Sequence, residues 1–373
     1  MRYLSAHYVY PVSSPPLRNG ILCVDDNGCI IDVIDVGGKL EERERLEFYN
    51  GILAPGFVNA HCHLELSHLR GIIEPRGGLP GFVSSIGHLR RASCEIILDA
   101  AKAADEEMTG NGIVAVGDIS NHADTLHIKR NSNIQYRTFI ELFGLDDHRS
   151  QEIFTAAQQV KQEYDHAGMA ASLAPHAVYS MSQTLCEALY RSYQSSPPDV
   201  VSMHHQESSE EQFIIHQKSI INDCLRKASR CLLVHNLFSS YNDLTEYTSP
   251  PARFYFVLCP KSNLYIQNRL PDFQLFSSQK LCPTVCLGTD SLASNTGLSI
   301  LEEMKTVQRY APEISFDTLL QWATLNGAHA LGFDRLLGSF EKNKRPGVNL
   351  ITGIDFEKKK LTDDSEVKVL VAN

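Results

Sequence analysis

Through the middle of the chain, short apolar runs alternate with longer stretches in which apolar residues recur at helical spacing. The clearest of the longer stretches begins at Ser93, a residue type that often precedes the first turn of a helix, and ends near Gly110. Eight apolar runs are predicted to be buried strands, at residues 57–60, 113–118, 136–142, 170–174, 200–203, 231–234, 254–258 and 285–288. Strands that alternate with helices form parallel sheets, and eight of them can close a barrel. We therefore predict an α/β fold of the (β/α)8 TIM-barrel type.

The two ends of the chain have a different pattern. Residues 21–24 and 29–36 are apolar runs separated by a polar turn that ends in Gly28, which predicts a small antiparallel sheet. Residues 348–351 and 367–371 are candidate strands near the other end. We expect both termini to contribute to one small β module.

The composition is that of a globular protein, with 43% hydrophobic and 21% charged residues. A formal net charge of −10, without a dense basic stripe, argues against nucleic acid as a partner. The ten cysteines are scattered singly and no signal segment is recognised, so we expect reduced thiols and a cytoplasmic location. No apolar run approaches the roughly 18 residues that span a bilayer, so we expect no membrane partner.

Two histidines, His61 and His63, directly follow the first predicted strand. In an extended segment residues i and i+2 point to the same side, so the two imidazoles face one point. Neutral imidazoles are good ligands for zinc, iron or nickel. Two polar residues hydrogen-bonded at a strand end would look the same in sequence.

A second cluster follows the fifth predicted strand as His204, His205, Gln206 and Glu207. Glutamate is a common general acid or base when a tight site and a nearby cation tune its protonation. The three-residue interval to Glu207 favours His204 over His205 as a metal ligand. His205 is more simply explained as a packing or supporting residue.

Two more polar residues end predicted strands. His235 ends the sixth, and Asp290 follows the eighth. A lone histidine there is often a satisfied core residue, and Asp290 could instead cap the next helix. Taken together, four strand ends carry histidine or aspartate at the rim where barrel enzymes keep their active sites.

Competing motifs fail. His63-Leu-Glu65 matches the H-x-E half of the cytidine-type zinc deaminases, but the P-C-x-x-C half is missing. H-E-x-x-H, G-x-S-x-G and Walker A strings are also missing, which disfavours metalloprotease, serine hydrolase and P-loop functions.

The segment Ala54-Pro-Gly-Phe-Val-Asn-Ala-His-Cys-His63 resembles the opening signature of the amidohydrolase superfamily, in particular its aminohydrolase branch. That branch includes cytosine and guanine deaminases, adenosylhomocysteine deaminases, aminodeoxyfutalosine deaminases and triazine chlorohydrolases. Further similar segments follow in the same order: Ala174-Pro-His-Ala-Val-Tyr179, Met203-His-His-Gln-Glu207, Cys259-Pro-Lys-Ser-Asn263, Leu287-Gly-Thr-Asp-Ser-Leu-Ala-Ser-Asn295 and Ala323-Thr-Leu-Asn-Gly-Ala328.

The resemblance implies a role for each matching residue. His61, His63, His204 and Asp290 would hold one divalent metal ion, with zinc expected and iron the alternative. Glu207, His235 and Asp290 would be catalytic, and the residues that contact substrate would be His176, Glu65 and His68.

The resemblance also implies a domain organisation, with a β-sandwich formed by residues 1–53 and 343–373 and a barrel over residues 54–342. One departure concerns the sandwich, because Arg345-Pro-Gly-Val-Asn-Leu-Ile351 lacks the usual Ala-Asp before its last strand. The extension from Glu65 to His68 looks most like the aminodeoxyfutalosine deaminase group.

We expect a metal-dependent hydrolase that deaminates an amidine-type carbon of a purine-like, nucleoside-like or other N-heterocyclic small molecule. Asp290 would receive a proton from water, Glu207 would protonate the adjacent ring nitrogen and His235 would orient the attacking oxygen. The same site could instead release chloride or open a cyclic amide. An inactive binding or scaffold protein on the same barrel is the alternative from another class. A homodimer is the oligomeric state we consider, because two-fold dimers are the commonest assemblies.

Overall fold

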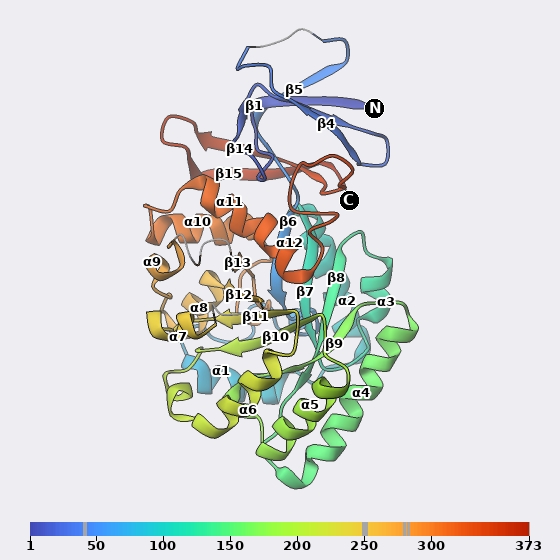
Figure 1. Cartoon of the computed structure of the whole chain (residues 1–373), viewed down its shortest axis with the longest axis vertical. Helices are drawn as coiled ribbons and strands as arrows, with labels where there is room; N and C mark the ends of the chain where they lie inside the picture. The colour runs from blue at the N-terminus through green and yellow to red at the C-terminus, as the bar shows by residue number, and fades with distance from the viewer. Residues whose placement is uncertain (40–42, 248–252, 279–280, 282–283, 373) are drawn as a thin grey trace.

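A computed structural model describes residues 1–39, 43–247, 253–278, 281 and 284–372, and contains two parallel four-stranded sheets and one larger mixed sheet (Figure 1). The first parallel sheet has the order β6 (Phe57–Cys62), β7 (Ile113–Ser120), β8 (Gln135–Leu142) and β9 (Ala171–Pro175). The second has the order β10 (Val200–His205), β11 (Arg230–His235), β12 (Arg253–Leu258) and β13 (Val285–Leu287). All eight strands predicted from the apolar runs are confirmed, and the fold is α/β.

The two parallel sheets meet near the carboxyl ends of their outer strands. The N–H of His204, in β10, donates to the carbonyl of His176, which follows β9, at 2.9 Å. At the other border, the N–H groups of Thr289 and Asp290 donate to the carbonyl of His61 at 3.1 and 3.0 Å. These contacts bring strand ends that are distant in sequence to one region.

Helices connect the parallel strands and cover them. The helix predicted to begin after Ser93 is confirmed as α2 (Cys94–Gly110), and the Ser93 hydroxyl accepts the Ile96 N–H. The others are α1 (Gly78–Leu89), α3 (Leu126–Asn131), α4 (Ser150–His166), α5 (Gln183–Ser195), α6 (Ile215–Leu225), α7 (Tyr241–Glu246), α8 (Pro260–Gln267), α9 (Phe273–Phe276), α10 (Ile300–Tyr310), α11 (Phe316–Ala323) and α12 (Leu325–Leu331). Among the elements that lie wholly within the described residues, four are short 3-10 helices: η1 (Leu64–Leu69), η2 (Asp147–Arg149), η3 (Val178–Ser180) and η4 (Ser209–Phe213).

The third sheet contains strands from both ends of the chain and lies at one end of the molecule (Figure 1). Its seven strands are β1 (Arg2–Val9), β2 (Leu17–Arg18), β3 (Ile21–Val24), β4 (Ile30–Ile34), β5 (Leu46–Ala54), β14 (Val348–Asp355) and β15 (Lys360–Val371). β14 is antiparallel to β5, with Asn349 opposite Ala54. The termini therefore share one sheet.

The expected antiparallel arrangement of the first fifty residues is only partly correct. β3 is antiparallel to both β1 and β4, but β1 and β5 are parallel neighbours. The chain runs through β3 and β4 before it returns as β5 on the other edge of β1, and this crossover makes the pair parallel.

The nine cysteines in the described residues are all free. None of the helices in that part of the chain has both the length and the apolar character needed to cross a membrane.

Candidate metal centre and active site

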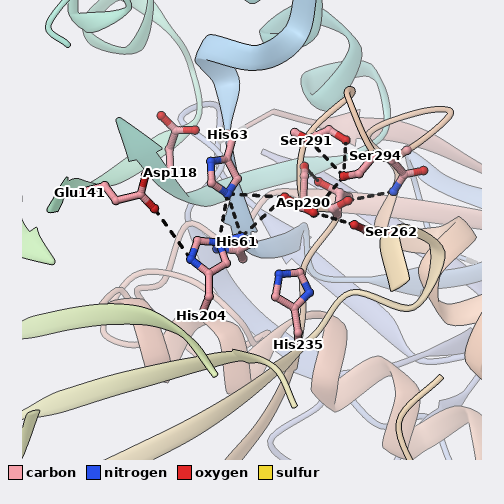
Figure 2. Close-up of polar contacts among 12 residues, drawn as sticks. His61, His63, Asp118, Glu141, His204, His235, Ser262, Asp290, Ser291 and Ser294 are labelled. Atoms are coloured by element: carbon pink, nitrogen blue, oxygen red, sulfur yellow. Dashed lines mark hydrogen bonds and ion pairs between the residues drawn. The ribbon is translucent and has the colours of Figure 1, made fainter. Parts of the chain in front are cut away.

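The carboxyl ends of the parallel strands bring four of the sequence-predicted residues to one point (Figure 2). The Nε2 atom of His63 lies 3.2 Å from Nε2 of His61 and 3.3 Å from Nε2 of His204. The Oδ1 atom of Asp290 lies 3.5 Å from Nε2 of His63 and 3.7 Å from Nε2 of His61. His235 also has a ring nitrogen within 4.8 Å of those of His61 and His204. Three imidazoles and a carboxylate are a donor set that suits a divalent transition metal.

Hydrogen bonds from behind orient two of these donors toward the common point. Nδ1 of His204 is 3.1 Å from the carbonyl of His176, which leaves Nε2 to face the other imidazoles. Oδ2 of Asp290 accepts hydrogen bonds from the hydroxyls of Ser262 and Ser294, at 2.6 and 2.8 Å, which leaves Oδ1 free. Supporting contacts of this kind fix the tautomer and direction of metal ligands.

The electrostatics of the cluster favour ligand forms of the side chains. Burial lowers the pKa of His63 to about 4, with His61 adding to the effect, and burial holds the pKa of His204 well below its usual value. Although burial alone would raise it, the surrounding histidines hold the pKa of Asp290 well below its usual value. Neutral imidazoles and an ionised carboxylate are the forms that bind a metal.

The backbone is unusual at the two strand ends that supply polar residues late in the chain. His235 and Asp290 have φ angles of 74° and 58°, in the left-handed region that non-glycine residues rarely adopt. Strained backbone of this kind persists where surrounding contacts over-determine it, and it is frequent at functional sites. Here it turns each side chain from its strand end toward the cluster.

Glu207 and His235 form a pair beside the metal cluster. Oε1 of Glu207 lies 3.6 Å from Nε2 of His235, whose Nδ1 is 3.0 Å from Oδ1 of Asn263. Burial, followed by the negative charge of Asp290, raises the pKa of Glu207 to about 8. A buried carboxyl whose pKa is raised in this way suits a residue that gives and takes protons.

A cavity of about 250 Å³ opens onto this cluster. One wall is apolar and comes mainly from α1, with Phe143 from the loop after β8. The other is polar and includes Asn121, Glu141 and His176. The residues that line the cavity are His63, Leu66, Leu79, Phe82, Val83, Ile86, Gly87, Arg90, Asn121, Glu141, Phe143, His176, Tyr179, Ser180, His204, Glu207, His235, Asp290 and Ser291. The cavity is thus amphipathic and has the size of a small-molecule site.

Of the three residues expected to contact substrate, His176 lines the cavity, whereas the described lining does not include Glu65 or His68. The Glu65 carboxylate accepts hydrogen bonds from the N–H groups of Asn121 and His122, both at 3.0 Å. Nδ1 of His68 lies 3.2 Å from the carbonyl of Glu65. Glu65 therefore supports the cavity wall from behind.

His205 points away from the metal cluster. Its Nδ1 is 3.0 Å from Oδ1 of Asn236, and its ring packs edge-on against Tyr247. Burial lowers its pKa to about 4, so the ring is neutral. These contacts give His205 a structural position behind β10.

A buried ion pair lies behind His63. Nζ of Lys129 is 2.5 Å from Oδ2 of Asp118, and neither side chain is exposed. Oδ1 of Asp118 accepts the N–H of Leu64, the residue after His63, at 2.7 Å. The pair therefore holds the backbone that carries a predicted metal ligand.

Sequence reasoning missed several polar residues at the site. Asn121, Glu141 and Arg90 line the cavity, and Ser262 and Asn263 hold Asp290 and His235. Sequence position could have indicated some of them. Glu141 lies near the end of a predicted barrel strand, and Ser262 and Asn263 lie in the segment Cys259-Pro-Lys-Ser-Asn263 that resembles the family.

Comparison with known proteins identifies the family. Residues 52–372 match the Amidohydrolase family, and the chain belongs to this family. An adenosine deaminase of Helicobacter pylori is 26% identical in an alignment that covers 88% of this chain and 87% of the relative.

Two solved structures have the same fold. The aminofutalosine deaminase of Helicobacter pylori in complex with methylthio-coformycin has a TM-score of 0.76 at 23% identity, covering 96% of this chain and 94% of that chain. An adenosine deaminase from Xanthomonas campestris with bound zinc has a TM-score of 0.79 at 21% identity, covering 96% of this chain and 86% of that chain.

Proposed function

We propose that this protein is a zinc-dependent aminohydrolase that removes ammonia from an amidine-type carbon of a purine nucleoside or a related N-heterocycle. One observation carries the proposal: His61, His63, His204 and Asp290 converge beside a Glu207 whose pKa is raised to about 8. A metal cluster beside an acidic carboxyl suits hydrolytic loss of an amine from a heterocycle, because the ring nitrogen must gain a proton as water adds to the neighbouring carbon. The relatives that are named deaminases, and the bound zinc in one of them, support the same conclusion.

We also propose how the three sheets are organised into domains. The two parallel sheets would form one (β/α)8 barrel over residues 54–342, and residues 1–53 and 343–373 would form a β-sandwich. The contacts from β10 to the end of β9, and from the Thr289 and Asp290 N–H groups to His61, support closure of the barrel.

A divalent ion held by the four residues would act as a Lewis acid and lower the pKa of a water molecule. The side chains then have distinct tasks. Oδ1 of Asp290 accepts a proton from the attacking water, because Oδ2 is already engaged by two serine hydroxyls. Nε2 of His235 orients the attacking oxygen, while Asn263 holds its other ring nitrogen.

Glu207 supplies the proton that the heterocycle needs. Its acid form would protonate the ring nitrogen beside the reacting carbon, which makes that carbon more electrophilic. The N–H of Glu207 donates to Oε1 of Glu211 at 2.8 Å, and its carbonyl accepts from Gln267 at 2.8 Å, so the residue is fixed. Asp290 would then give the water proton to the departing amino group, and the hydroxyl on the carbon would return a proton to Glu207, so that an amino-bearing carbon and water become a carbonyl carbon and ammonia.

The test is product release by purified full-length protein of measured metal content. Purines, pterins, pyrimidines and nucleosides are assayed, and at least one purine nucleoside should release ammonia. This activity should disappear when the metal is chelated and return when zinc is added. Release of chloride from a chlorinated heterocycle, or opening of a cyclic amide, without deamination would show a different hydrolase. Less than about half an equivalent of any transition metal, with no turnover, would show a binding protein.

A further inference from the structure

Glu141 has a buried carboxylate oxygen that nothing in the described residues satisfies. The residue lies near the end of β8 and lines the cavity, and its side chain is only 7% exposed. Oε1 has no hydrogen-bond partner there. A buried polar atom without a partner is costly in free energy, so an unmatched acceptor on a cavity wall indicates a ligand.

The other carboxylate oxygen is held in place. Oε2 of Glu141 accepts a hydrogen bond from Nδ2 of Asn121 at 3.2 Å. Asn121 is itself fixed, because its N–H donates to Glu65 at 3.0 Å and its Oδ1 accepts from Arg90 at 2.7 Å. Glu65 and Arg90 thus fix the orientation of Glu141, and Oε1 presents a preorganised acceptor to the cavity.

Two histidine nitrogens lie near this oxygen but do not reach it. Oε1 of Glu141 lies 3.7 Å from Nδ1 of His204 and 4.0 Å from Nε2 of His176. Both distances exceed a hydrogen bond, but two atoms 4.0 Å apart can both be reached by one ligand oxygen that lies about 2.8 Å from each, as Oε1 and Nε2 of His176 are spaced. A hydroxyl group there could donate to the carboxylate and still interact with the imidazole.

A second metal ion is a poorer occupant of this position. Nδ1 of His204 already lies 3.1 Å from the carbonyl of His176, and a nitrogen that makes that hydrogen bond carries the proton. It therefore has no lone pair for a cation. A ligand ammonium group is disfavoured as well, because the neighbouring cluster would hold a divalent cation on the other side of the His204 ring.

We propose that Oε1 of Glu141 accepts a hydrogen bond from a sugar hydroxyl of the substrate, and so selects nucleosides over free bases. This inference rests on the proposed function. The hydroxyl is held beside the metal centre rather than on it, because Glu141 faces the side of His204 opposite its metal-facing Nε2.

The experiment pairs protein variants with substrates that lack single hydroxyls. Values of kcat/KM are measured for a nucleoside that the wild-type protein deaminates and for its 2′-deoxy and 3′-deoxy derivatives. The proteins are the wild type, Glu141→Gln, Glu141→Ala and a control, Glu187→Gln, which changes a glutamate on α5 whose side chain is 43% exposed. Metal content and thermal unfolding are measured for each.

Loss of a hydrogen bond to a charged group predicts a fall in kcat/KM of roughly tenfold to a hundredfold. The wild type should show this loss with one deoxy derivative. Both Glu141 variants should show the same fall in kcat/KM with the parent nucleoside. Removal of the critical hydroxyl from the substrate should then lower their kcat/KM little further. Metal content and the control should be unchanged.

Two results would overturn the inference. One is an equal fall with the parent and both deoxy derivatives, which would assign Glu141 to the metal centre. The other is that the wild type prefers a substrate with a cationic substituent in place of the hydroxyl, and that Glu141→Gln abolishes this preference. Failure of the wild type to release ammonia from any nucleoside would instead refute the proposed function, and the inference with it.

Discussion

Asp290 is joined to His61 through both backbone and side chain. Its N–H donates to the His61 carbonyl at 3.0 Å, and its Oδ1 lies 3.7 Å from Nε2 of the same histidine. The last ligand-bearing segment is therefore positioned by the first. A change in the packing between these two strand ends should alter the metal site before it alters the rest of the fold.

A substitution at Gly288 tests whether the packing of these two strand ends positions the metal site. A Cβ atom at this position would lie 2.9 Å from Cβ of His61, closer than real Cβ contacts, and 3.0 Å from Cγ1 of Val257, which is tighter than most of them. We expect Gly288→Ala to destabilise the protein by about 1–3 kcal/mol and to weaken zinc binding. Urea unfolding and metal titration would measure both effects. Gly110→Ala is the matched control, since nothing lies within 4 Å of its Cβ position. Full zinc affinity in Gly288→Ala would contradict the prediction.

Glu207→Gln separates catalysis from metal binding. The amide cannot deliver a proton, so kcat should fall by about 10²–10⁴-fold while zinc content stays at the wild-type level. Steady-state ammonia release and elemental analysis are the measurements. Glu210→Gln, an exposed change three residues away, should have nearly normal activity. A Glu207→Gln protein with near-normal kcat would remove Glu207 from the mechanism.

Lys129→Met would leave the buried carboxylate of Asp118 unpaired. Although burial alone would lower it, Asp118 holds the pKa of Lys129 above its usual value, so the lysine is charged in the native protein. Loss of one partner of a buried pair costs about 3–5 kcal/mol. The double change Lys129→Met with Asp118→Asn should lose less, as measured by urea unfolding. Equal losses in the single and double variants would show that the charge of Asp118 is not the cause.

The raised pKa of Glu303 predicts that the free energy of unfolding depends on pH. Burial raises its pKa to about 7, whereas an unfolded glutamate titrates near 4.3, about its ordinary value. Between these values the unfolded chain has lost the proton that the folded protein keeps, so the unfolding free energy falls as pH rises. One such group contributes roughly 1.4 kcal/mol per pH unit.

In Glu303→Gln this contribution is absent. Its unfolding free energy should fall less steeply than that of the wild type between pH 5 and 7, and urea unfolding at both pH values would measure the difference. Parallel pH profiles for the two proteins would mean that Glu303 is ionised throughout this range.

The sequence predicted the parallel strands well because each is a short apolar run between helical stretches. It also located His61, His204, His235 and Asp290 at strand ends, and the parallel arrangement then explains why they meet. The position of a residue at a strand end is enough to predict that it lies near the others, because the carboxyl ends of parallel strands share one edge.

The residues that the sequence did not reveal depend on contacts between segments. Glu141 lies in an ordinary strand pattern, and its free oxygen is defined by Asn121, which follows β7. The family resemblance implied that Glu65 contacts substrate, but its carboxylate binds the backbone of the Asn121 segment. Strands β1 and β5 were also missed, because polar residues such as His7 in β1 and Asn50 in β5 interrupt their apolar pattern.

The pairing of β5 with β14 has a consequence for synthesis of the chain on the ribosome. β5 emerges early, but its neighbour at Asn349 is translated only after all eight parallel strands. One edge of the terminal sheet must therefore stay unpaired while the central region is made, and such edges are where nascent chains associate wrongly. Completion of this sheet is expected to be a late event of folding in the cell.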